Sequence, residues 1–241
     1  MCTVLFAPSG KNYFFASLRD EDPSRKKAVI PEVYSTNFIK YLSPRDSLAG
    51  GTWIGVNTLG HVIILLNGGF VNHEKKETYI KSRGLIVTEL LQTTKPITEW
   101  DMLNLEDIEP FTLIMWCDSA LYELVWDGIK KHRAIPDKNK IHIWSSSTLY
   151  DANAKAIRKD KLEIWLKNSE ILSPSDTLHF FKSYTDDNIG FIMNRNEKIR
   201  TLSFSSIELS DSDSARMNYL DFSTDTLHAL TLNLAQNINA C

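Results

Sequence analysis

The stretch that most constrains the fold is a pair of β-rich runs at the amino end of the chain. Residues 2–7 (CTVLFA) and 13–19 (YFFASLR) flank a PSGKN turn, and this pattern predicts a β-hairpin. Both strands are mostly apolar on both faces. Because a strand with one wet face alternates polar and apolar residues, these two strands are expected in a sheet that is covered on both sides.

Further strand pairs and helices follow this hairpin. A polar connection that holds Pro23 and Pro31 leads to a second strand pair, TWIGVN and VIILLNGG, around a TLGH turn. Later hairpins are expected from FTLIMWC with LYELVWDG and from IRTLSFSSIELS with ARMNYLDFS, and IHIW adds another strand. Helical patterns cover residues 83–93, 98–104, 148–168 and 174–184.

The helix expected over residues 148–168 has an apolar face, and the serines at 145–147 are expected to cap it. The residues predicted near that face are Ala154, Ile157, Ile164 and Trp165, and those predicted outside it are Lys155, Arg158 and Lys159.

The strand and helix pattern predicts one antiparallel-rich α+β domain over residues 1–241. A chain of 241 residues with 43% hydrophobic content can bury a large core. The sequence has no internal repeat and no linker long enough to divide it.

Charge and motif content argue against several classes of function. The net charge of −3 is mixed along the chain, and the densest basic stretch, residues 73–83, is interrupted by Glu74 and Glu77, so no nucleic-acid partner is expected. The six histidines show no metal-ligand spacing, and no phosphate loop or serine-hydrolase elbow is present. We therefore expect no metal and no required cofactor.

The apolar runs and the cysteine usage predict a cytoplasmic protein. The longest apolar runs are far shorter than the roughly 18 to 20 residues that span a bilayer, and early charges argue against a secretory signal. The three cysteines, Cys2, Cys117 and Cys241, have no close spacing, which suits a reducing compartment.

Cys2 directly follows the initiator methionine, and removal of Met1 would make it the amino terminus. Its thiol (reference pKa about 8.5) and its α-amine (about 7.7 to 8.0) would then belong to one residue. A thiolate is a nucleophile, and an amine on the same residue can take its proton.

The loop of the first hairpin decides what faces Cys2. A two-residue loop at Gly10 and Lys11 pairs Cys2 with Arg19, and a loop one residue earlier pairs it with Ser17; in both cases Cys2 and Arg19 share a face. A three-residue loop would separate them. By themselves these residues favour an ordinary buried cysteine and a surface arginine, because free cysteines are among the most buried residues.

Six motifs in order resemble the NRDE family, which includes the transport and Golgi organisation protein two. They are MCTV, RDED, AGGTWIGV, LLNGG, SRG and SSSTLYD, spread from the start of the chain to residue 151. The resemblance implies an N-terminal-nucleophile hydrolase fold, a four-layer αββα sandwich of two antiparallel sheets. In related cysteine amidases, such as bile salt hydrolases and penicillin V acylases, an N-terminal cysteine attacks an amide carbonyl.

By this resemblance Cys2 is the nucleophile, Arg19 and Asp20 support it, and the side-chain amide of Asn67 donates to the oxyanion. Bile salt hydrolases space their arginine and aspartate three apart, so Asp22 is an alternative carboxylate.

The sequence also departs from its relatives. Leu18 replaces the first letter of the family signature, and serines at 145–147 stand near the place of a second asparagine of the hydrolases. The residues expected to line the site are Trp53, Ser145 and Ser146.

Other interpretations of the matched residues stay open. Gly50 and Gly51 also suit a turn that lets Trp53 pack closely, and Asn67 with Gly68 is a common turn pair.

Two functions follow from the resemblance. The first is a hydrolase that cleaves a non-peptide amide or thioester of a small molecule through Cys2, after Met1 is removed. The alternative is a non-catalytic carrier or chaperone of hydrophobic cargo, with haem or a lipid or acyl-CoA as cargo, because known NRDE relatives are implicated in such processes. The sequence has no haem-attachment motif.

Overall fold

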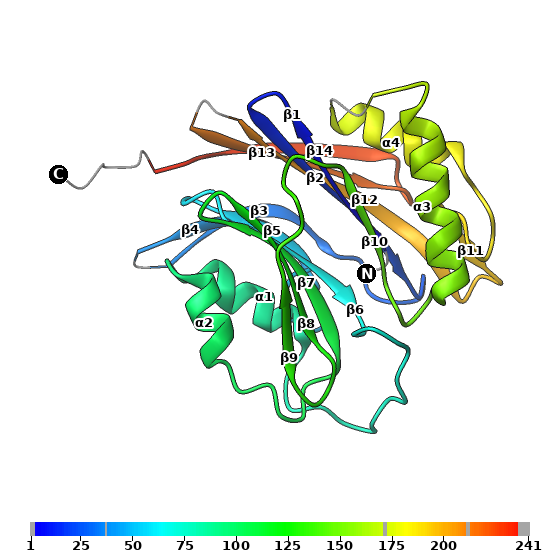
Figure 1. Cartoon of the computed structure of the whole chain (residues 1–241). Helices are drawn as coiled ribbons and strands as arrows, with labels where there is room; N and C mark the ends of the chain where they lie inside the picture. The colour runs from blue at the N-terminus through cyan, green and yellow to red at the C-terminus, as the bar shows by residue number, and fades with distance from the viewer. Residues whose placement is uncertain (1–2, 37, 171–172, 211–212, 236–241) are drawn as a thin grey trace.

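The computed structural model of the chain describes residues 3–36, 38–170, 173–210 and 213–235 (Figure 1). Two antiparallel sheets form the centre of the molecule, each with seven strands among these residues. The first sheet has the order β10-β1-β2-β12-β13-β14, with β11 paired to β12, and the second has the order β3-β4-β5-β6-β7-β8-β9.

The strands of the first sheet come from both ends of the chain and from its middle. Their bounds are β1 Thr3–Ser9, β2 Asn12–Glu21, β10 His142–Ser145, β11 Asn194–Arg195, β12 Ile199–Ser210, β13 Ser214–Asp221 and β14 Thr226–Asn233. The strands of the second sheet follow one another along the chain, and two helices between β6 and β7 interrupt this order. Its strands are β3 Val29–Ser35, β4 Lys40–Arg45, β5 Ile54–Asn57, β6 Val62–Asn67, β7 Phe111–Cys117, β8 Ala120–Trp126 and β9 Lys131–Ala134.

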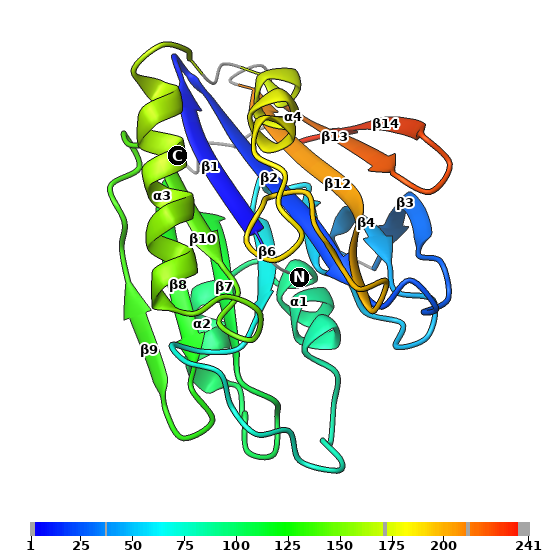
Figure 2. The ribbon, with the colours of Figure 1, turned by 90° about the vertical axis from the view of Figure 1, so that its right-hand side faces the viewer.

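A pair of helices covers the outer face of each sheet. Helices α3 (Ala152–Leu166) and α4 (Pro174–Ser183) lie on the first sheet, and α1 (Arg83–Leu91) and α2 (Pro96–Met102) lie against the second (Figures 1 and 2). This is the αββα arrangement that the resemblance implied, and the expectation of an α+β fold with two antiparallel sheets is confirmed.

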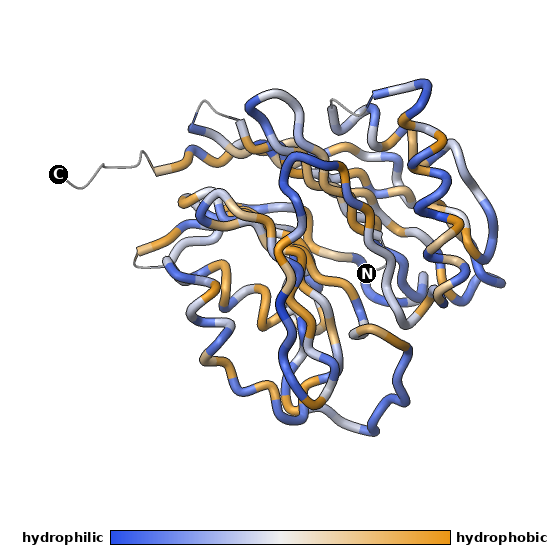
Figure 3. The backbone as a smooth tube through the Cα atoms, viewed as in Figure 1, coloured by the Kyte–Doolittle hydropathy of each residue, from blue (hydrophilic) through white to orange (hydrophobic). Residues whose placement is uncertain are grey.

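Alternate side chains of β1 enter two different cores. Val4 and Phe6 point between the sheets, whereas Leu5 and Ala7 join Phe180 under the outer helices. Figure 3 shows hydrophobic colour on strands of both sheets. Burial on both sides explains why these strands are apolar on both faces.

The register of the first hairpin places its loop at Gly10 and Lys11. Ser9 pairs with Asn12 across the end of the hairpin, and Thr3 pairs with Leu18 at its other end. The two-residue loop is therefore the one present. Cys2 itself lies outside the described residues.

Residues 29–45, expected as a polar connection, form strands β3 and β4 instead. That expectation was wrong because β3 is the edge of its sheet, and an edge strand tolerates Pro31, which has no N–H to donate. Strands β9 and β14 were also not expected, and β14 pairs along its whole length with β13.

Helix α3 differs from its prediction in its start and in its buried face. It begins at Ala152, and its N-cap is Asp151, whose carboxylate accepts the Ala154 backbone N–H; the serines at 145–147 do not cap it. Arg158, expected outside the buried face, is fully buried, whereas Ile164 is 54% exposed. Ala154, Arg158 and Leu162 are spaced four residues apart, so this row faces the sheet.

Candidate functional site

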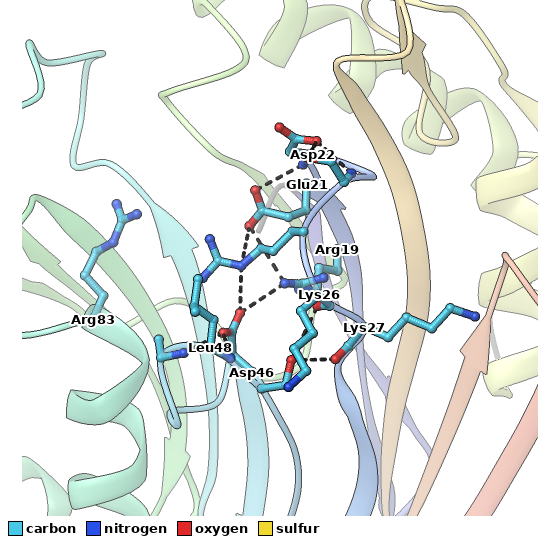
Figure 4. Close-up of polar contacts among 12 residues, drawn as sticks. Arg19, Glu21, Asp22, Lys26, Lys27, Asp46, Leu48 and Arg83 are labelled. Carbon is cyan, nitrogen blue, oxygen red and sulfur yellow. Dashed lines mark hydrogen bonds and ion pairs between the residues drawn. The ribbon is translucent and has the colours of Figure 1, made fainter.

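Arg19 is the buried cation at the end of β2, where the two sheets meet. It is 5% exposed, and its Nη2 donates to Oδ2 of Asp46 over 3.1 Å (Figure 4). Its guanidinium also lies 4.8 Å from the ring centre of Trp53. The same Nη2 also forms an ion pair with Oε2 of Glu21 at 3.8 Å. No hydrogen bond of Nε or Nη1 occurs within the described residues, so these donors stay available to a nearby group.

Asp46, in the loop between β4 and β5, organises this end of the site. Its carboxylate accepts the backbone N–H groups of Leu48 and Ala49 over 3.0 and 2.8 Å. It also accepts Nε of Arg25 over 3.0 Å, so one carboxylate holds two guanidinium groups. Burial raises the pKa of Asp46, but hydrogen bonds from Ala49, Arg25 and Leu48 outweigh it, and the pKa lies below the ordinary value of 3.8.

A cavity of about 120 Å³ opens beside Arg19 and Trp53. Its wall brings together two of the sequence motifs, because Gly51 packs directly on the backbone of Gly84 and any Cβ at position 51 would collide with it. The Thr52 N–H donates to the Gly84 carbonyl over 3.1 Å. Gly51 thus allows the close packing that the sequence predicted for the glycine pair, and it also lines this cavity.

Asn67, the last residue of β6, lies where that cavity meets a polar cavity of about 410 Å³. Its side chain is half-buried and has no hydrogen-bond partner within the described part of the chain. Gly68 follows with a positive φ of 84°, and a Cβ there would collide with Oγ of Ser147. Arg83 lines both cavities and forms an ion pair with Glu109 over 2.9 Å.

Asp20 points to the opposite face of β2 from Arg19. It is 4% exposed, and its carboxylate accepts the hydroxyl groups of Thr201 over 2.6 Å and Tyr150 over 3.3 Å. Asp20 also lines the 410 Å³ cavity. Arg19 and Asp20 therefore flank the end of β2 from two sides and do not pair with each other.

Asp22, the alternative carboxylate, is exposed beyond the end of β2. Its Oδ1 accepts the backbone N–H and the hydroxyl of Ser24 over 2.8 and 2.6 Å, and these bonds lower its pKa. The carboxylate therefore closes a turn, and Asp22 lines neither of the two cavities that Arg19 and Asp20 line.

The serines of the SSST segment lie beside the first residues of β1. Ser145 pairs with Thr3 in the sheet, and Ser145 and Ser146 line a cavity of about 320 Å³. The Ser146 hydroxyl lies 2.9 Å from that of Thr148. The Ser147 hydroxyl is buried with no partner among the described residues.

Sequence reasoning missed the residues that hold the charged side chains of the site. Asp46, Tyr150 and Thr201 come from separate segments of the chain, and only the fold brings them to Arg19 and Asp20. A local signal existed for Asp46 alone, because an aspartate that accepts N–H groups two and three residues on is a common turn former.

Cys117, the one described cysteine, is buried in β7, and burial together with Asp118 raises the pKa of its thiol to about 12. Among the described residues, no group of three or more histidine, cysteine, aspartate or glutamate side chains could hold a metal ion. No helix in this part of the chain is long and apolar enough to cross a membrane.

A comparison with known protein families shows to which family the chain belongs. The family described as Transport and Golgi organisation 2 matches residues 1–207. The chain belongs to this family. The match covers every motif quoted above, from MCTV to SSSTLYD. No curated protein matches the sequence.

Solved structures show that this family member has the N-terminal-nucleophile hydrolase fold. An N-acylethanolamine-hydrolyzing acid amidase ortholog from Caenorhabditis elegans aligns with a TM-score of 0.60 and 10% identity, over 86% of this chain and 92% of that one. A variant of the conjugated bile acid hydrolase from Clostridium perfringens aligns with a TM-score of 0.62 and 9% identity, over 99% and 100%. At such low sequence identity, the similarity to these two structures establishes a shared fold.

The anchoring role of Asp46 predicts a pH-dependent loss of stability. Asp46→Asn should lower the free energy of unfolding at pH 7 by about 1 to 3 kcal/mol, since hydrogen bonds to charged groups are worth this much. Because the folded-state pKa of Asp46 is lowered, its contribution is present above pH 3.8 and is lost as pH falls through the folded-state value. Urea unfolding of wild type and variant should therefore converge in acid.

The matched control is Asp107→Asn, which removes the exposed partner of Lys76 (Nζ to Oδ1, 2.7 Å). Exposed ion pairs contribute about 0 to 1 kcal/mol, so this variant should stay near wild type. Equal losses for both variants at pH 7 would contradict the anchoring role of Asp46.

Proposed function

We propose that this protein is a cysteine hydrolase that cleaves a non-peptide amide or thioester of a small molecule in the cytoplasm. In this proposal Met1 is removed, the Cys2 thiolate attacks the carbonyl carbon, and the Cys2 α-amine accepts the thiol proton and passes it to the leaving group. Water then hydrolyses the acyl-Cys2 intermediate, which releases the acid and restores the thiol.

The observation that carries this proposal is the register of β1 and β2 together with the buried Arg19. Thr3 pairs with Leu18, and the proposal extends this ladder by one residue so that Cys2 lies opposite Arg19. A guanidinium beside a thiol favours the thiolate and lowers its pKa. Asp46 and Trp53 hold the guanidinium in place, and its remaining donors would face the nucleophile.

Asn67 supplies the second requirement, a donor for the oxyanion. Its side chain has no hydrogen-bond partner within the described residues and lines both cavities at the end of β2. In the proposed mechanism its NH₂ group donates to the developing negative charge on the carbonyl oxygen. The named activities of the aligned proteins, an acid amidase and a bile acid hydrolase, add support from proteins of the same fold.

Labelling with a limiting amount of iodoacetamide tests the nucleophile. Intact-mass and peptide mass spectrometry of the purified protein should show that Met1 is absent and that Cys2 is alkylated first. Cys117 should react last, because a buried thiol with a pKa of about 12 is almost entirely protonated at neutral pH. Retained Met1, or labelling of Cys117 or Cys241 before Cys2, would contradict the proposal.

Hydrolysis assays test the oxyanion donor. A panel of fluorogenic acyl-aminocoumarin amides and acyl thioesters should yield product with wild type and none with Cys2→Ala. Asn67→Ala should lower kcat about 10²- to 10³-fold, the usual loss for one oxyanion donor. Asn139→Ala, in an exposed turn before β10, is the control and should leave kcat unchanged. An active Cys2→Ala variant would exclude the covalent mechanism.

A second candidate function, a carrier of haem or of a lipid or acyl-CoA, is favoured by two adjoining cavities. They measure about 540 and 320 Å³ and share Phe70, Ser147 and Lys155. Lys159 and Arg195 add basic groups to their otherwise mixed walls. Cavities with apolar surface and several cations suit cargo that is hydrophobic and carries acidic groups.

Titration with haemin and with a fluorescent acyl-CoA tests the carrier function. A carrier should bind at micromolar concentration with one equivalent of cargo per chain. Lys155→Met should weaken binding by about five- to tenfold through loss of one cation in a partly buried wall. No binding at that concentration, or equal binding by the variant, would count against these cavities as the cargo site.

A further inference from the structure

Arg158 is a fully buried arginine in the middle of α3, and the site described above does not include it. Its side chain passes from the helix to the first sheet. There one terminal nitrogen, Nη2, donates to the hydroxyl of Thr3, the first described residue of β1. The other, Nη1, donates to the carbonyl of Gly190 over 3.2 Å.

Two aromatic rings enclose the guanidinium of Arg158. Its central carbon lies 3.9 Å from the ring centre of Tyr150 and 4.6 Å from that of Phe191. Cation–π contacts of this kind stabilise a desolvated guanidinium. These contacts fix the position of the group that holds Thr3.

The burial of Arg158 is costly, and no carboxylate within the described residues forms an ion pair with it. Its Nε is buried with no partner there. A buried cation without a paired anion costs several kcal/mol, whereas a methionine or leucine would fill the same space at no such cost. The stability that comes from packing α3 on the first sheet therefore does not by itself explain an arginine at this position.

We propose that Arg158 is a positioning residue that fixes the amino end of β1 through Thr3, and so fixes the place of Cys2 beside Arg19. Thr3 is bonded to Cys2, and consecutive α-carbons lie about 3.8 Å apart, so anchoring one residue restricts the other. This inference rests on the proposed hydrolase function.

Other charged groups also face this region and contribute to the field there. From β2, Arg19 lies on one face, where the carboxylates of Asp46 and Glu21 contact it. Asp20, hydrogen-bonded to Tyr150, lies on the other face. The guanidinium of Arg195, before β12, lies 5.4 Å from the centre of the Tyr150 ring. Among the described residues, Arg158 is the charged residue whose side chain donates a hydrogen bond to the Thr3 hydroxyl.

The test is the pH dependence of Cys2 alkylation by iodoacetamide in four variants. Arg158→Met should slow alkylation at pH 7 about tenfold and move the midpoint of the rate profile to higher pH, because Cys2 would no longer be held beside Arg19, the cation that favours its thiolate. Arg158→Lys keeps one donor for Thr3, so its rate and midpoint should return toward wild type. Thr3→Val removes the hydroxyl that Arg158 holds, so it should change the rate and the midpoint in the same direction as Arg158→Met.

Lys161→Met is the matched control, because it removes one exposed charge from the same helix without touching Thr3. Its rate and midpoint should equal those of wild type. All rates are measured well below the melting temperature of each variant, so that every variant is folded. A shift of the midpoint then reports a change at Cys2 and not a loss of stability. Wild-type rate and midpoint in Arg158→Met would overturn the inference.

Hydrogen exchange separates failure of this inference from failure of the proposed function. If Cys2 of wild type is not the first cysteine labelled, the hydrolase proposal fails, and exchange of the β1 amides then decides the anchoring role. Faster exchange at Thr3 and Val4 in Arg158→Met, with no change in Lys161→Met, supports the anchor. Unchanged exchange in both variants overturns it.

Discussion

The pairing of β1 with β2 is the constraint on which the rest of the structure depends. Its two-residue loop sets a register that places Arg19 one step beyond the pair of Thr3 and Leu18. Because side chains alternate along a strand, a shift of one residue would turn Arg19 out of the inter-sheet space and Asp20 into it. The register therefore fixes both the two cores and the position of every charged group at the end of β2.

The charged groups at this end are held by contacts that converge from distant segments. Asp46 reaches Arg19 from the loop after β4, and Thr201 reaches Asp20 from β12. Each acceptor or donor is itself oriented by backbone N–H groups or by burial. Charged side chains held in this way are preorganised, which is the condition that the proposed hydrolase function requires of them.

The two faces of the first sheet contribute different things to the candidate site. The inter-sheet face carries Arg19, which lines a small cavity together with Trp53, the residue that precedes β5 of the second sheet. The outer face carries Thr3 and Asp20, which contact α3 and the segment that leads to it through Arg158 and Tyr150. The first described residue of β1 is therefore held from the outer face, while the buried cation of β2 lies on the inter-sheet face.

The sequence by itself determined the strands that are apolar on both faces, the first hairpin and the family motifs, because each depends on neighbours in the chain or on a short ordered pattern. It did not determine the strand at Val29–Ser35, where an edge position makes Pro31 acceptable, or the burial of Arg158. Only the tertiary structure decided those, together with the meeting of Arg19 and Asp46. The physical reason is that burial and pairing of polar groups depend on partners far away in sequence, and no local pattern records them.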